Sequence, residues 1–128
     1  MTESDVAARL RAVTETVLDE MQRAGWFLEA SRVRQFDRPT EWDINCGWCE
    51  DWAMAAAEAV GGEVVDLGDL GMDPDEWSHI ILVRNGRFYD AQDPDGVEEL
   101  EALHLVRGVT RAEWLAARSE PCRSPAMG

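Results

Sequence analysis

A β-hairpin is encoded in one short stretch of the chain, where residues 79–92 read HIILVRNGRFYDAQ. At its centre is Asn85-Gly86, which suits a two-residue turn between antiparallel strands because both residue types tolerate positive φ. Apolar residues of strong β-propensity flank the turn on both sides. We therefore predict strands at residues 79–83 and 87–91, joined by this turn.

The predicted hairpin places a histidine beside a carboxylate. A two-residue turn sets a register in which Ile81 pairs with Asp90 and His79 lies opposite Gln92. Because side chains alternate between the two faces of a strand, His79 and Asp90 are diagonal neighbours on one face, about 7–8 Å apart between α-carbons. By the same alternation Asp93 points to the other face. We therefore expect a His79–Asp90 contact, which is also compatible with a core histidine that a carboxylate merely satisfies.

The rest of the chain predicts three helices and one further strand. Residues that recur at spacings of three and four indicate an amphipathic helix near the N-terminus, and an alanine-rich stretch that stops at Gly61-Gly62 indicates another. A capping box, Thr110 to Glu113, opens a short helix near the C-terminus. We expect helices at residues 4–24, at 49–60 and from residue 110, and a strand beginning at 64–65. Residues 26–45 are expected to be loop with room for a short helix, and residues 66–76 to be a loop.

Length and composition bound the domain organisation. A chain of 128 residues can form one hydrophobic core but not two, and 45% hydrophobic residues with six tryptophans argue against disorder. We therefore predict a single α+β domain over residues 1–118, in which a helix packs on a small antiparallel sheet. A flexible tail is expected at residues 119–128.

Charge and targeting signals constrain partners and location. The net charge of −14 argues against nucleic acid or an anionic membrane as a partner, since both need a positive surface. No apolar run approaches the roughly 20 residues of a membrane span, and the acidic start does not resemble a secretory signal. We therefore expect a cytoplasmic protein, and the sequence leaves its oligomeric state open.

The cysteines carry the second chemical signal. Cys46, Cys49 and Cys122 are an odd number without a secretory context, which favours catalysis or metal binding over a disulfide framework. Cys49 is predicted to lie where a glycine-containing loop meets a helix N-terminus. The positive end of a helix lowers a thiol pKa, and its free N–H groups can bind an oxyanion, whereas the neighbouring acids Glu50 and Asp51 act in the opposite direction on the pKa.

These motifs resemble a known family. Residues 47–53, GWCEDWA, resemble the nucleophile segment of bacterial transglutaminase-like cysteine peptidases, and residues 46–49, CGWC, are similar to the segment around the papain-type nucleophile. Downstream, residues 78–83, SHIILV, and 86–90, GRFYD, resemble the family's histidine strand and the aspartate that ends the next strand. The order of cysteine, histidine and aspartate also agrees, and the similarity covers residues 45–96.

The resemblance implies a papain/transglutaminase-like core and a catalytic triad. Cys49 would be the nucleophile, His79 the base and Asp90 the acid that orients the imidazole. Such an enzyme acts on an amide or thioester of a protein or peptide substrate and needs neither cofactor nor metal. Hydrolysis, acyl transfer and deamidation all remain open.

Further site residues follow less directly. Papain-like enzymes place a glutamine six residues before the nucleophile, where this chain has Asp43. The nearer amide donor is Asn45, which we take as the oxyanion-hole candidate beside the Cys49 backbone N–H. The candidates for a substrate groove are Trp48, Trp77 and Gln92.

Three alternatives remain open. A thiol–disulfide oxidoreductase would use Cys46-x-x-Cys49, although no strongly apolar strand precedes the motif. A zinc site would combine these two cysteines with His79, His104 or Cys122, although no second close pair of ligands exists. The third alternative is a catalytically inactive binding module of the same fold.

Overall fold

The computed structural model describes residues 1–25, 39–73 and 79–117, which form an α+β fold. The predicted tail at 119–128 lies outside these residues. Within them are four helices, α1 (Glu3–Arg23), α2 (Glu41–Gly47), α3 (Cys49–Val60) and one at residues 111–117. The strands β1 (Glu63–Asp66), β2 (Ile80–Arg84) and β3 (Arg87–Tyr89) form one antiparallel sheet in the order β1-β2-β3, and short 3-10 turns η2 (Leu67–Leu70) and η3 (Leu100–Ala102) lie in the connections. None of the helices described is both long and apolar enough to cross a bilayer.

Helix α1 begins at a capping box, as its sequence allows. The Thr2 backbone N–H donates to Asp5 Oδ2 at 3.0 Å, and the Asp5 backbone N–H donates to Thr2 Oγ1 at 3.1 Å. Each bond satisfies a donor that the first helical turn would otherwise leave free. The predicted apolar stripe faces the core, so α1 provides one wall of it. Val13 in this stripe is half-buried, and its other members are buried: Val6, Leu10, Val17, Leu18 and Met21.

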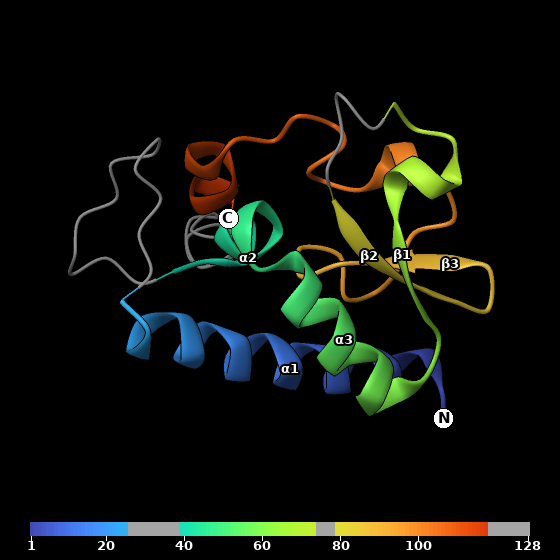
Figure 1. Ribbon diagram of the computed structural model, residues 1–128, viewed down its shortest axis with the longest axis horizontal. Helices are drawn as coiled ribbons and strands as arrows, with labels where there is room; N and C mark the ends of the chain where they lie inside the picture. The colour runs from blue at the N-terminus through green and yellow to red at the C-terminus, as the bar shows by residue number, and fades with distance from the viewer. Residues whose placement is uncertain (26–38, 74–78, 118–128) are drawn as a thin grey trace, which may run out of the picture.

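Helix α3 lies between α1 and the sheet (Figure 1). Ala53 and Ala56 are fully buried, and these small side chains let the helix approach β2 closely. Trp52 fills the space toward α1, where its Nε1–H donates to Thr14 Oγ1 at 2.9 Å. The main core therefore forms between the two helices and one face of the sheet. The other face carries a smaller core centred on Leu67, Ile81 and Leu103.

The β2–β3 hairpin has the predicted turn and register. Asn85 and Gly86 have φ values of 51° and 75°, as a type I′ turn requires. Leu82 pairs with Tyr89, and Val83 pairs with Phe88. The prediction that β3 continues to residue 91 is wrong, because the ladder ends at Tyr89.

A turn replaces the predicted strand after Tyr89. Asp90 Oδ1 accepts hydrogen bonds from the backbone N–H groups of Gln92 and Asp93, both at 3.0 Å. An aspartate that binds the N–H groups following it favours a turn over a β-ladder. The expected pairing of Ile81 with Asp90, and the place of His79 opposite Gln92, therefore do not form.

The segment before Cys49 contains a short helix, for which the expected loop at 26–45 left room, and this helix also takes the place of the glycine-containing loop expected directly before Cys49. Helix α2 ends at Gly47, and only Trp48 separates it from α3. The N-terminus of α2 is held by Asp43, whose Oδ2 accepts from the Thr40 backbone N–H at 2.8 Å and from the Thr40 hydroxyl at 3.0 Å. Arg111 donates its Nε–H to the same buried carboxylate at 3.0 Å. The spacing from Thr40 to Asp43 is a helix-start signal that our prediction did not use.

Two adjacent glycines between α3 and β1 provide a test of this packing. Gly61 and Gly62 both have positive φ, but a Cβ on Gly62 would lie 2.6 Å from the backbone oxygen of Val83, whereas one on Gly61 meets no atom of the described residues within 4 Å. We expect Gly61→Ala to lower the free energy of unfolding by about 1 kcal/mol through backbone strain alone. Gly62→Ala must also displace β2 and should cost about 3 kcal/mol. Equal losses for the two variants in urea unfolding would contradict this packing.

Candidate active site

The predicted His79–Asp90 contact is confirmed. His79 lies directly before β2 and Asp90 directly after β3, and His79 Nε2 is 3.0 Å from Asp90 Oδ2. Each of the two side chains is 1% exposed. The other carboxylate oxygen accepts two backbone N–H groups, so Asp90 is fixed on both sides. A buried and fully bonded carboxylate of this kind can hold an imidazole in one orientation.

Cys49 is the first residue of α3 and is partly buried. Burial has the largest single influence on the pKa of its thiol and raises it, because the charged form is disfavoured away from water. The nearby His79 imidazole and the backbone N–H groups of Ile80 and Glu50 together outweigh burial. The net effect is a lowered pKa for Cys49, so the thiolate is favoured.

The pKa of the His79 imidazole is shifted so that its charged form is favoured too. Burial is again the largest single influence and lowers its pKa, but the hydrogen bond to Asp90 and the nearby Cys49 thiol raise the pKa to about 9. His79 Nδ1 is buried and has no hydrogen-bond partner among the described residues, and Nε2 is held by Asp90. Nδ1 is therefore the nitrogen that remains to exchange a proton with the thiol. Such contacts are often loose in a protein without substrate and tighten when it binds.

Cys46 differs from Cys49 in reactivity. The residue is exposed at the end of α2, yet the pKa of its thiol is raised to about 12. Burial of the thiol contributes most, followed by the negative charges of Asp43 and Cys49. The neighbouring charges thus act in the same direction as burial. Cys46 therefore stays protonated at neutral pH, and only the thiolate is a good nucleophile.

The amide of Asn45 holds the turn that follows Asp90. Its Nδ2–H donates to Gln92 Oε1 at 2.9 Å, and its Oδ1 accepts the Ala91 backbone N–H at 3.3 Å. Asn45 is 2% exposed, so these bonds are shielded from water. The structure thus gives Asn45 a supporting role behind the His79–Asp90 pair, and its role as an oxyanion donor stays a prediction.

The predicted groove residues have separate surroundings. Trp48 forms the corner between α2 and α3 and packs against the main core. Gln92 is 3% exposed, and its Nε2 has no hydrogen-bond partner within residues 1–25, 39–73 and 79–117. Trp77 lies outside the described residues.

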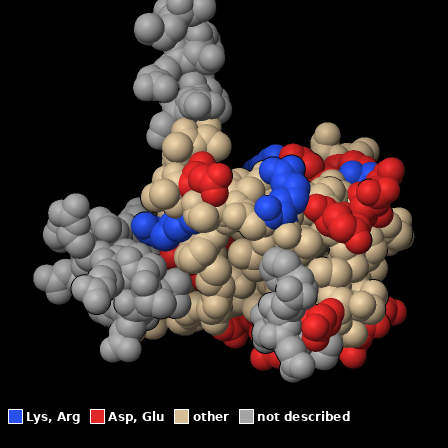
Figure 2. All heavy atoms as spheres, turned by 90° about the horizontal axis from the view of Figure 1, so that it is seen from above, with Lys and Arg blue, Asp and Glu red and all other residues tan. Residues whose placement is uncertain are grey.

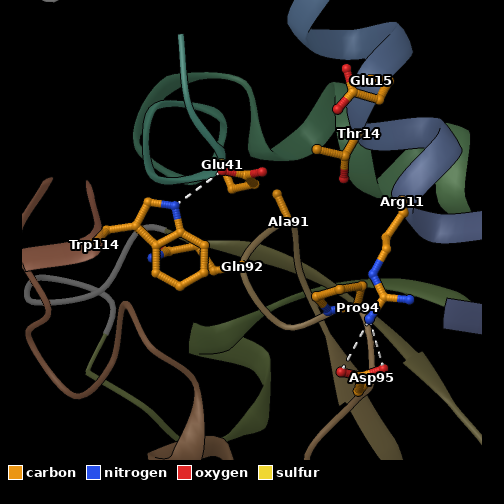
Figure 3. A pocket seen from close by; sticks show the side chains of 9 residues that line it. All are labelled: Arg11, Thr14, Glu15, Glu41, Ala91, Gln92, Pro94, Asp95 and Trp114. Carbon is orange, nitrogen blue, oxygen red and sulfur yellow. Dashed lines mark hydrogen bonds and ion pairs between the residues drawn. The ribbon is translucent and has the colours of Figure 1, made fainter. Parts of the chain in front are cut away.

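Gln92 lines a cavity of about 360 Å³ whose lining does not include Cys49, His79 or Asp90. It is formed by α1, α2, the turn after Asp90 and the helix at residues 111–117. In Figure 3, Arg11 reaches toward Asp95, and the Trp114 indole donates to Glu41 Oε1 at 3.0 Å.

A second histidine–carboxylate pair lies beside Asp90, and the sequence did not suggest it. His104 Nδ1 is 2.8 Å from Asp93 Oδ1, and the His104 backbone N–H donates to Asp93 Oδ2 at 3.0 Å. Burial, followed by the charge of Asp90, raises the pKa of Asp93, and the contacts with His104 oppose this. The ring of His104 meets that of Trp114 edge-on, with 5.1 Å between centroids. No motif or spacing around His104 could have indicated this contact.

Metal ligands and known relatives add no further assignment. Across residues 1–25, 39–73 and 79–117, no three histidine, cysteine or acidic side chains gather as a metal site would require, and Cys122 lies outside these ranges. Comparison with protein-family models, curated proteins and solved structures finds no match for this chain.

Proposed function

We propose that this protein is a cysteine-dependent hydrolase or acyltransferase of papain/transglutaminase-like type, with Cys49, His79 and Asp90 as its triad. The observation that carries the proposal is the buried imidazole of His79. One of its nitrogens is bound to Asp90, and the other has no hydrogen-bond partner in the described part of the chain. The imidazole lowers the pKa of the nearby Cys49 thiol, and the thiol raises the pKa of the imidazole. A thiol and an imidazole tuned in this way are poised as an ion pair.

The reaction follows from this pair. The Cys49 thiolate attacks the carbonyl carbon of an amide or thioester, and the carbonyl oxygen takes up the negative charge. The His79 imidazolium gives its proton to the leaving amine or thiol as the bond to carbon breaks, which leaves a thioester on Cys49. Water or an amine then attacks the thioester, His79 takes its proton, and Cys49 is released. Asp90 holds the imidazole in the tautomer that both steps need.

The start of α3 supplies the charge stabilisation. The backbone N–H of Cys49 belongs to the first turn of the helix, where N–H groups have no intrahelical acceptor. Donors that point at a developing oxyanion and the positive end of the helix both stabilise it. Asn45 remains the candidate for a second donor. Gln92 accepts one of its two amide hydrogens, which leaves the other to bind an oxyanion.

Surface charge favours basic or neutral segments of a protein or peptide as substrate. Acidic side chains form several patches on the face shown in Figure 2, with basic side chains between them. The chain carries a net charge of −14. An acidic surface attracts cationic segments and repels acidic ones, most strongly at low ionic strength.

The pKa values predict a defined pH window for acylation. As the pH falls through the lowered pKa of Cys49, the thiolate is protonated and the rate decreases. As the pH rises through about 9, His79 loses the proton that the leaving group needs, and the rate decreases again. We expect initial acylation rates to follow a bell whose alkaline limb lies near pH 9. Alkylation by iodoacetamide needs only the thiolate and should not fall there. An alkaline limb near the ordinary histidine pKa of about 6.5 would contradict the assignment.

Mass spectrometry of a trapped acyl-enzyme tests the proposed function. The protein is incubated with a small activated thioester, quenched in acid and digested. We expect one acyl group on the peptide that contains Cys49, and faster loss of that group when an amine is added if transfer is possible. His79→Ala should reduce the acylation rate by about 10²–10⁴-fold. An adduct on another residue, or acylation that is unaffected in His79→Ala, would refute the proposal.

A further inference from the structure

We propose that His104 is a positioning residue for the triad, acting through Asp93 on Asp90. This inference rests on the proposed function, since a positioning role has meaning only if His79 and Asp90 act on a substrate. It names a residue outside the triad that no sequence motif indicates. We draw this inference from the contacts of the turn at residues 90–93.

The orientation of Asp90 depends on the backbone of this turn. Asp90 Oδ1 accepts the N–H groups of Gln92 and Asp93 at 3.0 Å each, and the Asp93 N–H also lies 3.1 Å from the Asp90 carbonyl oxygen. In this closed turn, Oδ2 is directed at His79 Nε2. A change in the turn is therefore transmitted to the imidazole.

Electrostatic repulsion works against the closed turn. The carboxylates of Asp90 and Asp93 are both buried, and the charge of Asp90 contributes to the raised pKa of Asp93. Like charges this close in a poorly solvated site disfavour each other. His104 offsets the repulsion, because its backbone N–H and its ring Nδ1 contact both oxygens of Asp93 at 3.0 and 2.8 Å.

The ring of His104 is itself fixed. Trp114 meets it edge-on, and the indole N–H of Trp114 donates to Glu41 in α2. The turn at residues 90–93 is also held by Asn45 from α2, which bonds to Gln92 and to the Ala91 backbone. The turn that carries Asp90 is thus anchored on two sides, and His104 provides the anchor that balances charge.

Two variants separate the donor of His104 from its ring. His104→Asn keeps a side-chain N–H near the position of Nδ1 but removes the ring, whereas His104→Phe keeps a ring against Trp114 but removes the donor. We expect His104→Phe to weaken the His79–Asp90 hydrogen bond and lower the pKa of His79. A less charged His79 stabilises the Cys49 thiolate less, so the pKa of the thiol rises. At a pH below that pKa, alkylation of Cys49 should therefore slow about tenfold. His104→Asn should stay close to the wild type.

The readouts are the nitrogen-bound ring proton of His79 in NMR spectra and the pH profile of Cys49 alkylation. Neither depends on turnover, so the wild-type acyl-enzyme experiment can fail while the His79 resonance still reports the contact with Asp90. A packing role for His104 predicts the reverse order, with His104→Asn impaired and His104→Phe normal. That order, or an unchanged His79 resonance in His104→Phe with only a lower melting temperature, would overturn the inference.

Discussion

Replacement of Cys49 by alanine is expected to abolish covalent acylation, with turnover reduced on the order of 10⁶-fold. The sulfur forms the bond to the acyl group, and alanine offers no atom that can replace it. The fold should persist, because Cys49 is only partly buried at the first position of α3. The measurement is the rate of acyl-probe labelling followed by intact-protein mass.

Cys46→Ala is the matched control for this variant. Cys46 lies three residues earlier, is exposed, and has a thiol whose pKa is raised to about 12. Its loss should leave the labelling rate within a factor of about two. Labelling that survives in Cys49→Ala but disappears in Cys46→Ala would refute the assignment. Loss of labelling in both variants would favour chemistry that needs the two thiols together, as in a thiol–disulfide oxidoreductase.

Asp90→Asn is expected to reduce acylation on the order of 10³–10⁴-fold, although the side chain is nearly the same size. The backbone N–H groups of Gln92 and Asp93 require an oxygen at the Oδ1 position, so the asparagine amide nitrogen must face His79 Nε2. That N–H needs an acceptor, which forces the His79 proton onto Nδ1. An imidazole protonated at Nδ1 and neutral cannot take the thiol proton through that atom.

Asp95→Asn controls for the change of carboxylate to amide. Asp95 lies a few residues along the same connection, where its exposed side chain pairs with Arg11 at 3.1 Å. Its replacement should leave both the acylation rate and its pH profile unchanged. If Asp90→Asn stays within tenfold of the wild type, then Asp90 does not select the His79 tautomer and serves only to satisfy a buried histidine.

Much of the hairpin could be predicted because its signals are local. Asn85-Gly86 specifies a turn by its positive φ values, and the turn then sets the pairing of every residue up to Tyr89. Asp90 was identified by strand alternation, yet it lies one residue beyond the strand. The contact with His79 holds because Asp90 is still adjacent to the end of the ladder, whereas Gln92, two residues further, has left it.

The parts that could not be predicted depend on contacts between distant segments. Strand alternation predicts only that Asp93 points to the face opposite Asp90. Asp93 lies in a turn, where side chains do not alternate, so this rule could not predict its contact with His104. For the buried Asp43, the resemblance indicates only that it stands where papain-like enzymes have a glutamine. Its role as the start of α2 and the partner of Arg111 joins residues 68 positions apart. Such tertiary pairing has no periodic signature in a single sequence.

The most direct test of the central claim is an NMR titration of the His79 ring in the wild type and in Cys49→Ala. If His79 forms an ion pair with the Cys49 thiolate while Asp90 holds its other nitrogen, the imidazole should titrate with a pKa of about 9 in the wild type. Removal of the thiol should lower that pKa, because one of the two groups that raise it is lost. A wild-type pKa near the ordinary value of about 6.5, unchanged in Cys49→Ala, would show that the thiol and the imidazole do not act as a pair.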